Sequence, residues 1–368
     1  MSLRVSRWWL LAALPVIVVL PALAQLAPAA RSYPSPQAEL NAGITLTKQG
    51  KYRQAIPLLR DARDKVQDVF AAGFDLALCY AATGENRQAL LLLGQLPVAP
   101  TVASRAQVEN LRAQVEIGLG DAAAAQAAFQ KAAVLEPTHL PLYLYLADAC
   151  IAHGQFALGQ HIVAAGLQQL PNSARLHYEQ AVLAEDTNHP RAATRAWLAT
   201  EWLAHGRVIG LMAGAQADVA QAQFPAAIAA ARQGLQREPK NVLLLVILSQ
   251  AILRSGARPG QPAFQQARQA LQRAVALQPH NAAVQLTLAR LELAAGKPAA
   301  AIPHLELARR LAPGGPAVYA RLAAAYERMG MKPQAQAALA RLAALNRAKT
   351  AAYRAPAATH ASYNGGPQ

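Results

Sequence analysis

The sequence contains no set of residues whose types and spacing would carry out a catalytic reaction. It has no glycine-rich phosphate loop ending in Lys-Ser or Lys-Thr, no His-Glu-x-x-His zinc motif, no Cys-x-x-Cys pair and no Gly-x-Ser-x-Gly nucleophile turn. The nine histidines are scattered along the chain, whereas metal ligands must converge on one point. These absences predict a protein that is not an enzyme and that uses no metal or small-molecule cofactor.

The charge of the chain is unevenly distributed. The formal net charge is +15, and residues 187–368 carry 21 Lys/Arg against 6 Asp/Glu, whereas residues 25–186 carry 12 against 14. A basic half of this kind attracts anionic partners and speeds their association. The other interpretation is that arginine serves only as the solubilising residue of an alanine-rich protein.

The first 24 residues have the three parts of a secretory leader. Arg4 and Arg7 form a basic start, residues 8–20 form an apolar core, and a small-residue stretch ends at Ala24. We therefore expect a signal peptide over 1–24, a Pro/Ala-rich linker over 25–35, and a periplasmic or extracellular protein. The alternative is a membrane anchor that is not cleaved, because the apolar stretch nearly reaches spanning length.

Proline and glycine recur with a fixed period through the rest of the chain. Pro137 and Pro171 are 34 residues apart, and so are Gly296 and Gly330. The composition, 54% hydrophobic but only 5% aromatic, favours closely packed helices over strands. A fixed period of this size is typical of a stacked array of helical hairpins. In each hairpin, proline would separate successive units and glycine would supply the left-handed turn between the two helices.

The residues within this period carry a recognisable pattern. Tyr319-x2-Leu322-Ala323-x2-Tyr326 is followed by Ala335-x3-Leu339. In this pattern the chain resembles the tetratricopeptide repeat family, and in particular its exported bacterial members. The resemblance implies an all-α fold, an α-solenoid (right-handed superhelix) of about nine tetratricopeptide-type helical hairpins.

The predicted array covers 36–349, and the tail over 350–368 lacks helical periodicity and is predicted to be disordered. The seventh unit is longer because its hairpin turn carries an insertion. The nine predicted units are 36–69, 70–103, 106–139, 140–173, 174–207, 208–241, 242–281, 282–315 and 316–349.

The resemblance also implies where partners bind. In this family the first helices of the units line a concave groove that binds peptides. Four arginines on the first helices of the last three units are then expected to face the groove: Arg254, Arg290, Arg321 and Arg328. Further along, Asp148, Glu185 and Asp186 would form an acidic stretch. Taken alone, the adjacent pair Glu185 and Asp186 is typical of a solvated helix face, because adjacent residues point apart on a helix.

The sequence therefore predicts an exported protein–protein interaction scaffold or adaptor. It would bind a peptide or protein segment with acidic residues, and the family suggests a role in envelope assembly or secretion. The alternative is an electrostatic module that holds an anionic membrane surface or polysaccharide through the basic half. No nucleic acid partner is expected, because the units carry no consistent pair of base-reading side chains.

Four side chains outside the predicted groove have expected environments. Cys79 and Cys150 are expected to be buried free thiols, too far apart for a disulfide. Trp197 is expected in the core, and Trp202 is expected to be partly exposed.

Overall fold

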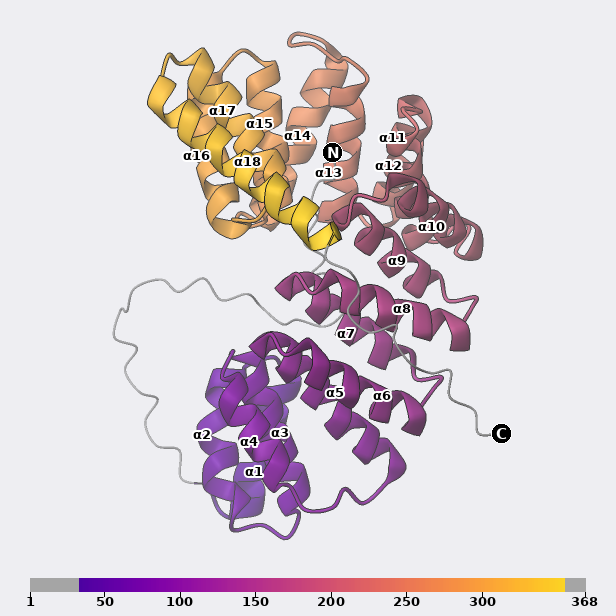
Figure 1. Cartoon of the computed structure of the whole chain (residues 1–368), viewed down its shortest axis with the longest axis vertical. Coiled ribbons are helices and arrows are strands. Elements are labelled where there is room, and N and C mark those ends of the chain that lie inside the picture. Colours follow the sequence, from indigo (N-terminus) through magenta and orange to yellow (C-terminus); the bar gives the residue numbers. More distant parts are fainter. Residues whose placement is uncertain (1–32, 355–368) are drawn as a thin grey trace. The chain divides into compact units, whose positions relative to one another are not determined.

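The structure is a computed structural model that describes residues 33–354, with side chains described as far as Arg347. In this part of the chain there are eighteen α-helices and no strand (Figure 1). The predicted all-α fold built of tetratricopeptide-type hairpins is confirmed. The predicted leader, most of the predicted linker and residues 355–368 of the predicted tail lie outside the described residues.

In the described residues the helices follow one another as hairpins. Two of the first helices begin earlier than the predicted units 70–103 and 106–139, at Val69 and at Val102. The pairs are α1 (Pro36–Lys48) with α2 (Tyr52–Arg63), α3 (Val69–Ala82) with α4 (Asn86–Gln95), α5 (Val102–Leu119) with α6 (Ala122–Leu135), α7 (Leu140–His153) with α8 (Phe156–Gln169), α9 (Ala174–Asp186) with α10 (Pro190–Leu203), α11 (Val208–Ala220) with α12 (Phe224–Arg237), α13 (Val242–Arg254) with α14 (Pro262–Leu277), α15 (Ala282–Ala294) with α16 (Pro298–Leu311), and α17 (Pro316–Arg328) with α18 (Lys332–Arg354).

The chain divides into two compact units. The first unit ends at Ala199 and the second begins at Thr200, so the boundary falls within α10. The last helix, α18, continues to Arg354, so the residues at 350–354 are helical although the sequence pattern placed them in the tail. None of the described helices is both long enough and apolar enough to cross a membrane.

The hairpin turns show why glycine recurs. Gly120 follows α5 with φ +87°, a left-handed conformation that glycine adopts without a steric penalty. The next residue, Asp121, then caps α6 by accepting a hydrogen bond from the backbone N–H of Ala124 at 2.9 Å. Two hairpins lack glycine at this place, and there Asn188 and Ala222 take φ values of 64° and 60°.

The strained turn at Ala222 leads to a prediction about stability. A left-handed alanine costs about 1–2 kcal/mol, and the extra backbone entropy of glycine offsets part of what a substitution would recover. Ala222→Gly is therefore expected to stabilise the second unit by about 0.5–1 kcal/mol, which is about 2 °C in Tm. Thermal unfolding followed by circular dichroism measures the shift. Asn188→Gly is the matched control and should gain less, because asparagine tolerates this conformation. A lower Tm for Ala222→Gly would contradict the prediction.

The prolines between the helical repeats have a second role, since their carbonyl groups accept hydrogen bonds. In four repeats a polar side chain near the start of the first helix reaches the carbonyl oxygen of the proline six residues earlier. The pairs are Tyr143 with Pro137 at 2.6 Å, His177 with Pro171 at 3.0 Å, Gln285 with Pro279 at 2.6 Å and Tyr319 with Pro313 at 3.0 Å. Each bond gives a side-chain partner to a backbone acceptor where one repeat passes to the next.

Small apolar side chains and a few large ones form the core. Trp197 is 1% exposed and packs edge-to-face on Tyr178, with ring centroids 4.6 Å apart, as predicted for a core residue. Trp202 is 78% exposed, which confirms its predicted exposure. Cys79 and Cys150 are buried free thiols, as predicted. Burial raises the pKa of Cys79 to about 11 and that of Cys150 to about 12, so neither thiol is reactive near neutral pH.

Candidate functional site

Three arginines of the second unit come together on three successive first helices. Arg254 ends α13, Arg290 lies in α15 and Arg321 lies in α17. Helices α13 and α15 contact each other directly, and so do α15 and α17. Each arginine therefore projects from a helix that packs against the next, and we refer to these three residues as the arginine cluster.

Arg290 occupies the middle of the arginine cluster. Its side chain is half-buried, and burial lowers the pKa of Arg290 to about 10, with further lowering by the charges of Arg321 and Arg254. The charges of both Arg321 and Arg254 contribute to the lowered pKa of Arg290, so both residues act on it as like charges. Arg290 is thus a partly desolvated cation between two like charges.

Two of the other three predicted arginines, Arg254 and Arg328, are held by neighbouring groups. The guanidinium of Arg254 lies over the ring of Phe224, 5.4 Å from its centroid, in a cation–π contact that orients the side chain. Arg328 lies outside the cluster, and its Nη1 donates a hydrogen bond to the carbonyl oxygen of Leu293 at 3.0 Å. Sequence reasoning did not find Phe224, because nothing in the repeat pattern links this first residue of α12 with α13.

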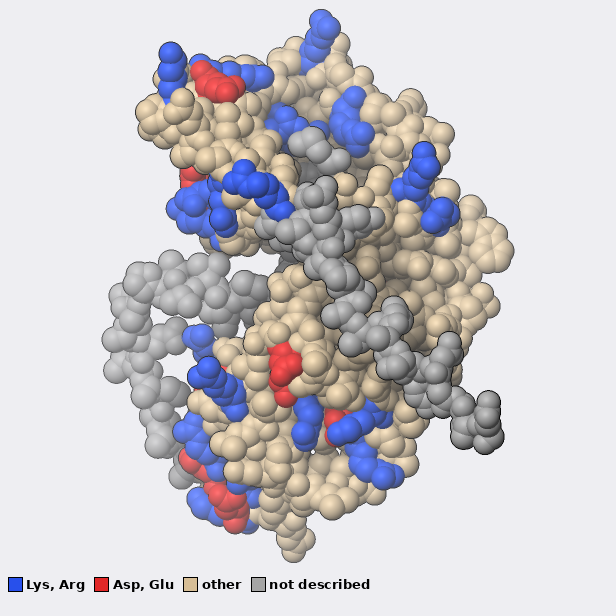
Figure 2. All heavy atoms as spheres, in the orientation of Figure 1, with Lys and Arg blue, Asp and Glu red and all other residues tan. Residues whose placement is uncertain are grey.

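Within the described residues, no carboxylate forms an ion pair with a member of the arginine cluster. The carboxylate of Glu306 on α16 already accepts hydrogen bonds from Arg309 at 2.7 Å and from the hydroxyl of Tyr326 at 3.0 Å. Residues 200–347 carry 17 Lys/Arg but only 6 Asp/Glu. On the face shown in Figure 2, basic side chains are widespread over the second unit and acidic ones are few. The cluster therefore has positive charge that no ion pair within the described part of the chain neutralises.

The predicted acidic residues lie in the first unit, and one of them is used within its own hairpin. Oε1 of Glu185 accepts a hydrogen bond from the indole Nε1 of Trp197 at 3.1 Å. Burial raises the pKa of Glu185 to about 7, although the indole hydrogen bond opposes the shift. This carboxyl is directed from α9 to the core tryptophan of α10. Asp148 is half-buried on α7.

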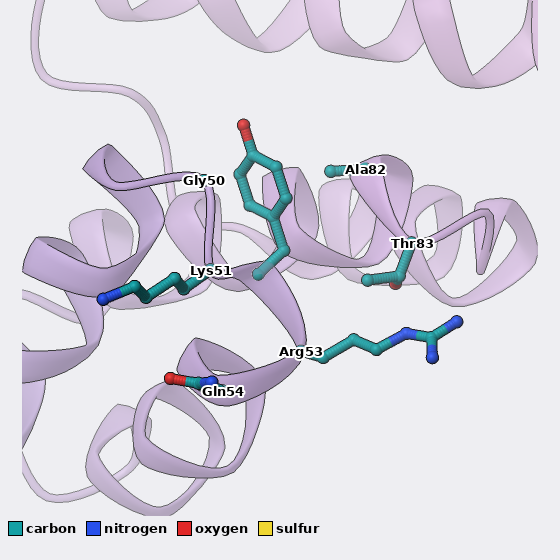
Figure 3. Close-up of a pocket in the computed structure, with 7 residues that line it drawn as sticks. Gly50, Lys51, Arg53, Gln54, Ala82 and Thr83 are labelled. Carbon is teal, nitrogen blue, oxygen red and sulfur yellow. The ribbon is translucent and has the colours of Figure 1, made fainter. Parts of the chain in front are cut away.

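The first unit also has a small surface cavity of about 180 Å³ at the tips of its first two hairpins. Its lining residues are Gly50, Lys51, Tyr52, Arg53, Gln54, Ala82 and Thr83. Figure 3 shows that the side chains of Lys51 and Arg53 point in opposite directions, so they do not converge on a common ligand. Among the described residues there is also no group of three or more His, Cys, Asp or Glu side chains that could hold a metal ion. The arginine cluster is therefore the better candidate site.

Solved structures share this fold at low sequence identity. The crystal structure of yeast Tom70 matches with a TM-score of 0.56 and 15% identity, over 84% of this chain and 67% of that one. A monomeric mutant of IFIT1 with Gppp-AAAA matches with a TM-score of 0.50 and 13% identity, over 85% of this chain and 78% of that one. At these identities the likeness is one of fold alone. No curated protein matches the chain in sequence.

Family models identify the repeats directly. One tetratricopeptide repeat model matches residues 46–115, 116–183 and 292–358. A second tetratricopeptide repeat model matches residues 263–316, which include the first helix that carries Arg290. The first model alone covers more than half of the sequence. The chain therefore belongs to the tetratricopeptide repeat family.

Proposed function

We propose that the protein is a scaffold that binds an acidic segment of a partner protein at the arginine cluster and Arg328. The observation that carries the proposal is Arg290, a half-buried cation between Arg254 and Arg321 with no ion-pair partner in the described structure. Tetratricopeptide arrays are stacked hairpins that offer extended surfaces for binding. The proposed function is thus recognition of a partner and involves no chemical reaction.

The binding mechanism follows from the electrostatics of the cluster. A carboxylate placed between two guanidinium groups would replace their mutual repulsion with two charge-assisted hydrogen bonds. Because Arg290 is partly removed from water, its attraction for a carboxylate is less screened than that of an arginine on the open surface. We therefore expect Arg290 to contribute more to affinity than the more exposed arginines of the unit.

The proposal includes export of the protein. The basic start, apolar core and small-residue end of residues 1–24 support a secretory leader, and hence a periplasmic or extracellular role in envelope assembly or secretion. The second candidate function is an electrostatic module that holds an anionic membrane surface or polysaccharide. The excess of basic residues over the whole second unit favours it, since such attraction needs no specific arrangement of charges.

Removing the four predicted arginines tests the proposal. Replacing Arg254, Arg290, Arg321 and Arg328 with alanine is expected to weaken binding of a fluorescent glutamate-rich peptide at least tenfold and to flatten its salt dependence. Fluorescence anisotropy across a salt series measures both quantities.

The matched control removes the same four positive charges from second helices of the repeats in the second compact unit. It replaces the four exposed residues Arg237, Arg310, Arg341 and Arg347 with alanine. Under the proposal this control changes affinity less than twofold. An equal loss in both variants would favour the electrostatic module, and unchanged binding in the first variant would reject the proposed site.

A further inference from the structure

The last described helix exposes a residue that is buried at the equivalent place in every other repeat. Leu339 ends the Ala335-x3-Leu339 pattern on α18 and is 44% exposed. The residue that follows Ala-x3 or Gly-x3 at this place in the other eight second helices is at most 3% exposed. These eight residues are Leu59, Leu93, Phe129, Val163, Trp197, Ala231, Leu271 and Leu305.

The equivalent residues are buried because the first helix of the following repeat packs on them. Phe129 of α6 lies edge-to-face with Tyr143 of α7, with ring centroids 6.0 Å apart. Leu305 of α16 belongs to the same buried cluster as Leu322 of α17. Among the described helices none follows α18, so Leu339 has no such neighbour there (Figure 1). This side of a second helix is therefore a surface that receives another helix.

Leu339 belongs to a continuous apolar strip on α18. Leu342 is half-buried and Ala343 is exposed, and both lie on the same side of the helix as Leu339 because residues three and four apart are neighbours on a helix surface. We refer to Leu339, Leu342 and Ala343 as the terminal apolar face. The outermost helix of a soluble repeat array normally presents polar residues to water. The terminal apolar face instead keeps the character of an internal repeat.

The charges around the terminal apolar face indicate the chemistry of its partner. The sequence of the last hairpin, residues 316–354, carries seven Lys/Arg and one acidic residue, Glu327 of α17. Helix α18 has no Asp or Glu, and Arg341 and Arg347 on it are exposed. Helices that pack through an apolar strip select one another by the charges that border it. A partner helix with acidic residues beside its apolar strip is therefore complementary to α18.

Other segments of this chain fit the face less well. Pairing of α18 with α18 of a second copy would bring two basic helices together. Stacking of α1 from a second copy would supply no exposed large apolar side chain, and exposed residues of α1 include Gln37, Asn41 and Thr45. Residues 355–368 contain no Leu, Ile, Val, Met or Phe, so their sequence lacks the side chains for an apolar strip.

We propose that the terminal apolar face binds an amphipathic α-helix of a partner protein whose apolar strip is bordered by acidic residues. The partner helix takes the place that the first helix of a following repeat has elsewhere in the array. Its apolar side chains cover Leu339, and its acidic residues face the basic residues of α18. This surface lies on a different helix from the arginine cluster, so the proposal does not depend on the proposed function.

Three fluorescent eighteen-residue peptides test the proposal with the full-length chain. The first is an amphipathic helix with a strip of leucines bordered by glutamates, the second has the same residues in scrambled order, and the third has lysine in place of each glutamate. We expect the first peptide to bind at least tenfold more tightly than the others in fluorescence anisotropy. Leu339→Gln should weaken its binding at least tenfold.

The matched control is Leu198→Gln on α10, because Leu198 is also 44% exposed. It should change the affinity for the first peptide less than twofold, and circular dichroism establishes that both variants are folded. Arg290→Leu separates this proposal from the proposed function, since it should weaken binding of the glutamate-rich peptide and leave binding of the amphipathic peptide unchanged.

The remaining outcomes would overturn the proposal. Equal binding of the ordered and scrambled peptides would show that charge alone is recognised, and equal or tighter binding of the lysine peptide would reject an acidic partner. Unchanged affinity in Leu339→Gln, or no binding of the first peptide, would reject the face as its site. A dimer in light scattering that dissociates in Leu339→Gln would assign the face to a second copy of the chain.

Discussion

Replacing Arg290 with leucine is expected to stabilise the second unit and, at the same time, to weaken acidic-peptide binding at least tenfold. Arg290 is a half-buried cation whose pKa is lowered to about 10 by burial and by the charges of Arg321 and Arg254. A buried charge without a partner opposes folding, and an apolar side chain of similar volume at such a place is often stabilising. Because Arg290 is only partly buried, the expected gain is on the order of 1 kcal/mol.

The opposite effect on binding makes this prediction informative. Replacing a residue that serves only solubility would change peptide binding little. Replacing a residue that serves only packing would lower the stability of the protein. A destabilised group is typical of a binding site in which a ligand supplies the missing partner. Urea unfolding and peptide anisotropy on one preparation measure both effects. Arg310→Leu, which removes an exposed arginine of α16, should change neither quantity appreciably. A less stable Arg290→Leu variant that binds as tightly as the parent would contradict the assignment.

Replacing Glu185 with glutamine is expected to remove most of a pH-dependent loss of stability in the first unit. The pKa of Glu185 is raised from 4.5 to about 7, mainly by burial. The folded state therefore holds this proton more tightly than the unfolded state does. Stability is greatest below about pH 4.5, falls as the pH rises to about 7, and stays low above it. The loss has an upper limit of about 3 kcal/mol, because one pKa unit corresponds to about 1.4 kcal/mol.

Glutamine separates the charge from the hydrogen bond. Its amide oxygen can still accept from the indole of Trp197, but it does not ionise. The Glu185→Gln variant should therefore be more stable than the parent at pH 8 and nearly equal to it at pH 4.5. Urea unfolding at several pH values, followed by tryptophan fluorescence, measures this difference. A smaller slope should remain, because burial also raises the pKa of Asp75 to about 6. Glu327→Gln, at an exposed position, serves as the control, and a parallel pH profile for Glu185→Gln would refute the prediction.

The repeat pattern by itself determined the architecture. The 34-residue spacing that relates Pro137 to Pro171 and Gly296 to Gly330 predicted an all-α array of helical hairpins, and the described residues form such hairpins. This works because a hairpin depends on local signals: a proline that ends a helix, a glycine that adopts positive φ, and apolar residues at helical spacing. Each helical repeat packs mainly against the repeats next to it in the chain, so the local pattern is sufficient to predict the fold.

Only the tertiary structure decided which of the charged residues meet. The sequence placed Arg254, Arg290 and Arg321 on first helices, but their mutual approach depends on packing between units that are tens of residues apart. The sequence likewise grouped Glu185 with the acidic residues of the groove, whereas the structure shows its carboxyl bonded to Trp197 in the next helix. Periodicity specifies on which face of a helix a residue lies. Which group a long polar side chain contacts is decided by rotamers and by the neighbouring helices, and a single sequence does not contain that information.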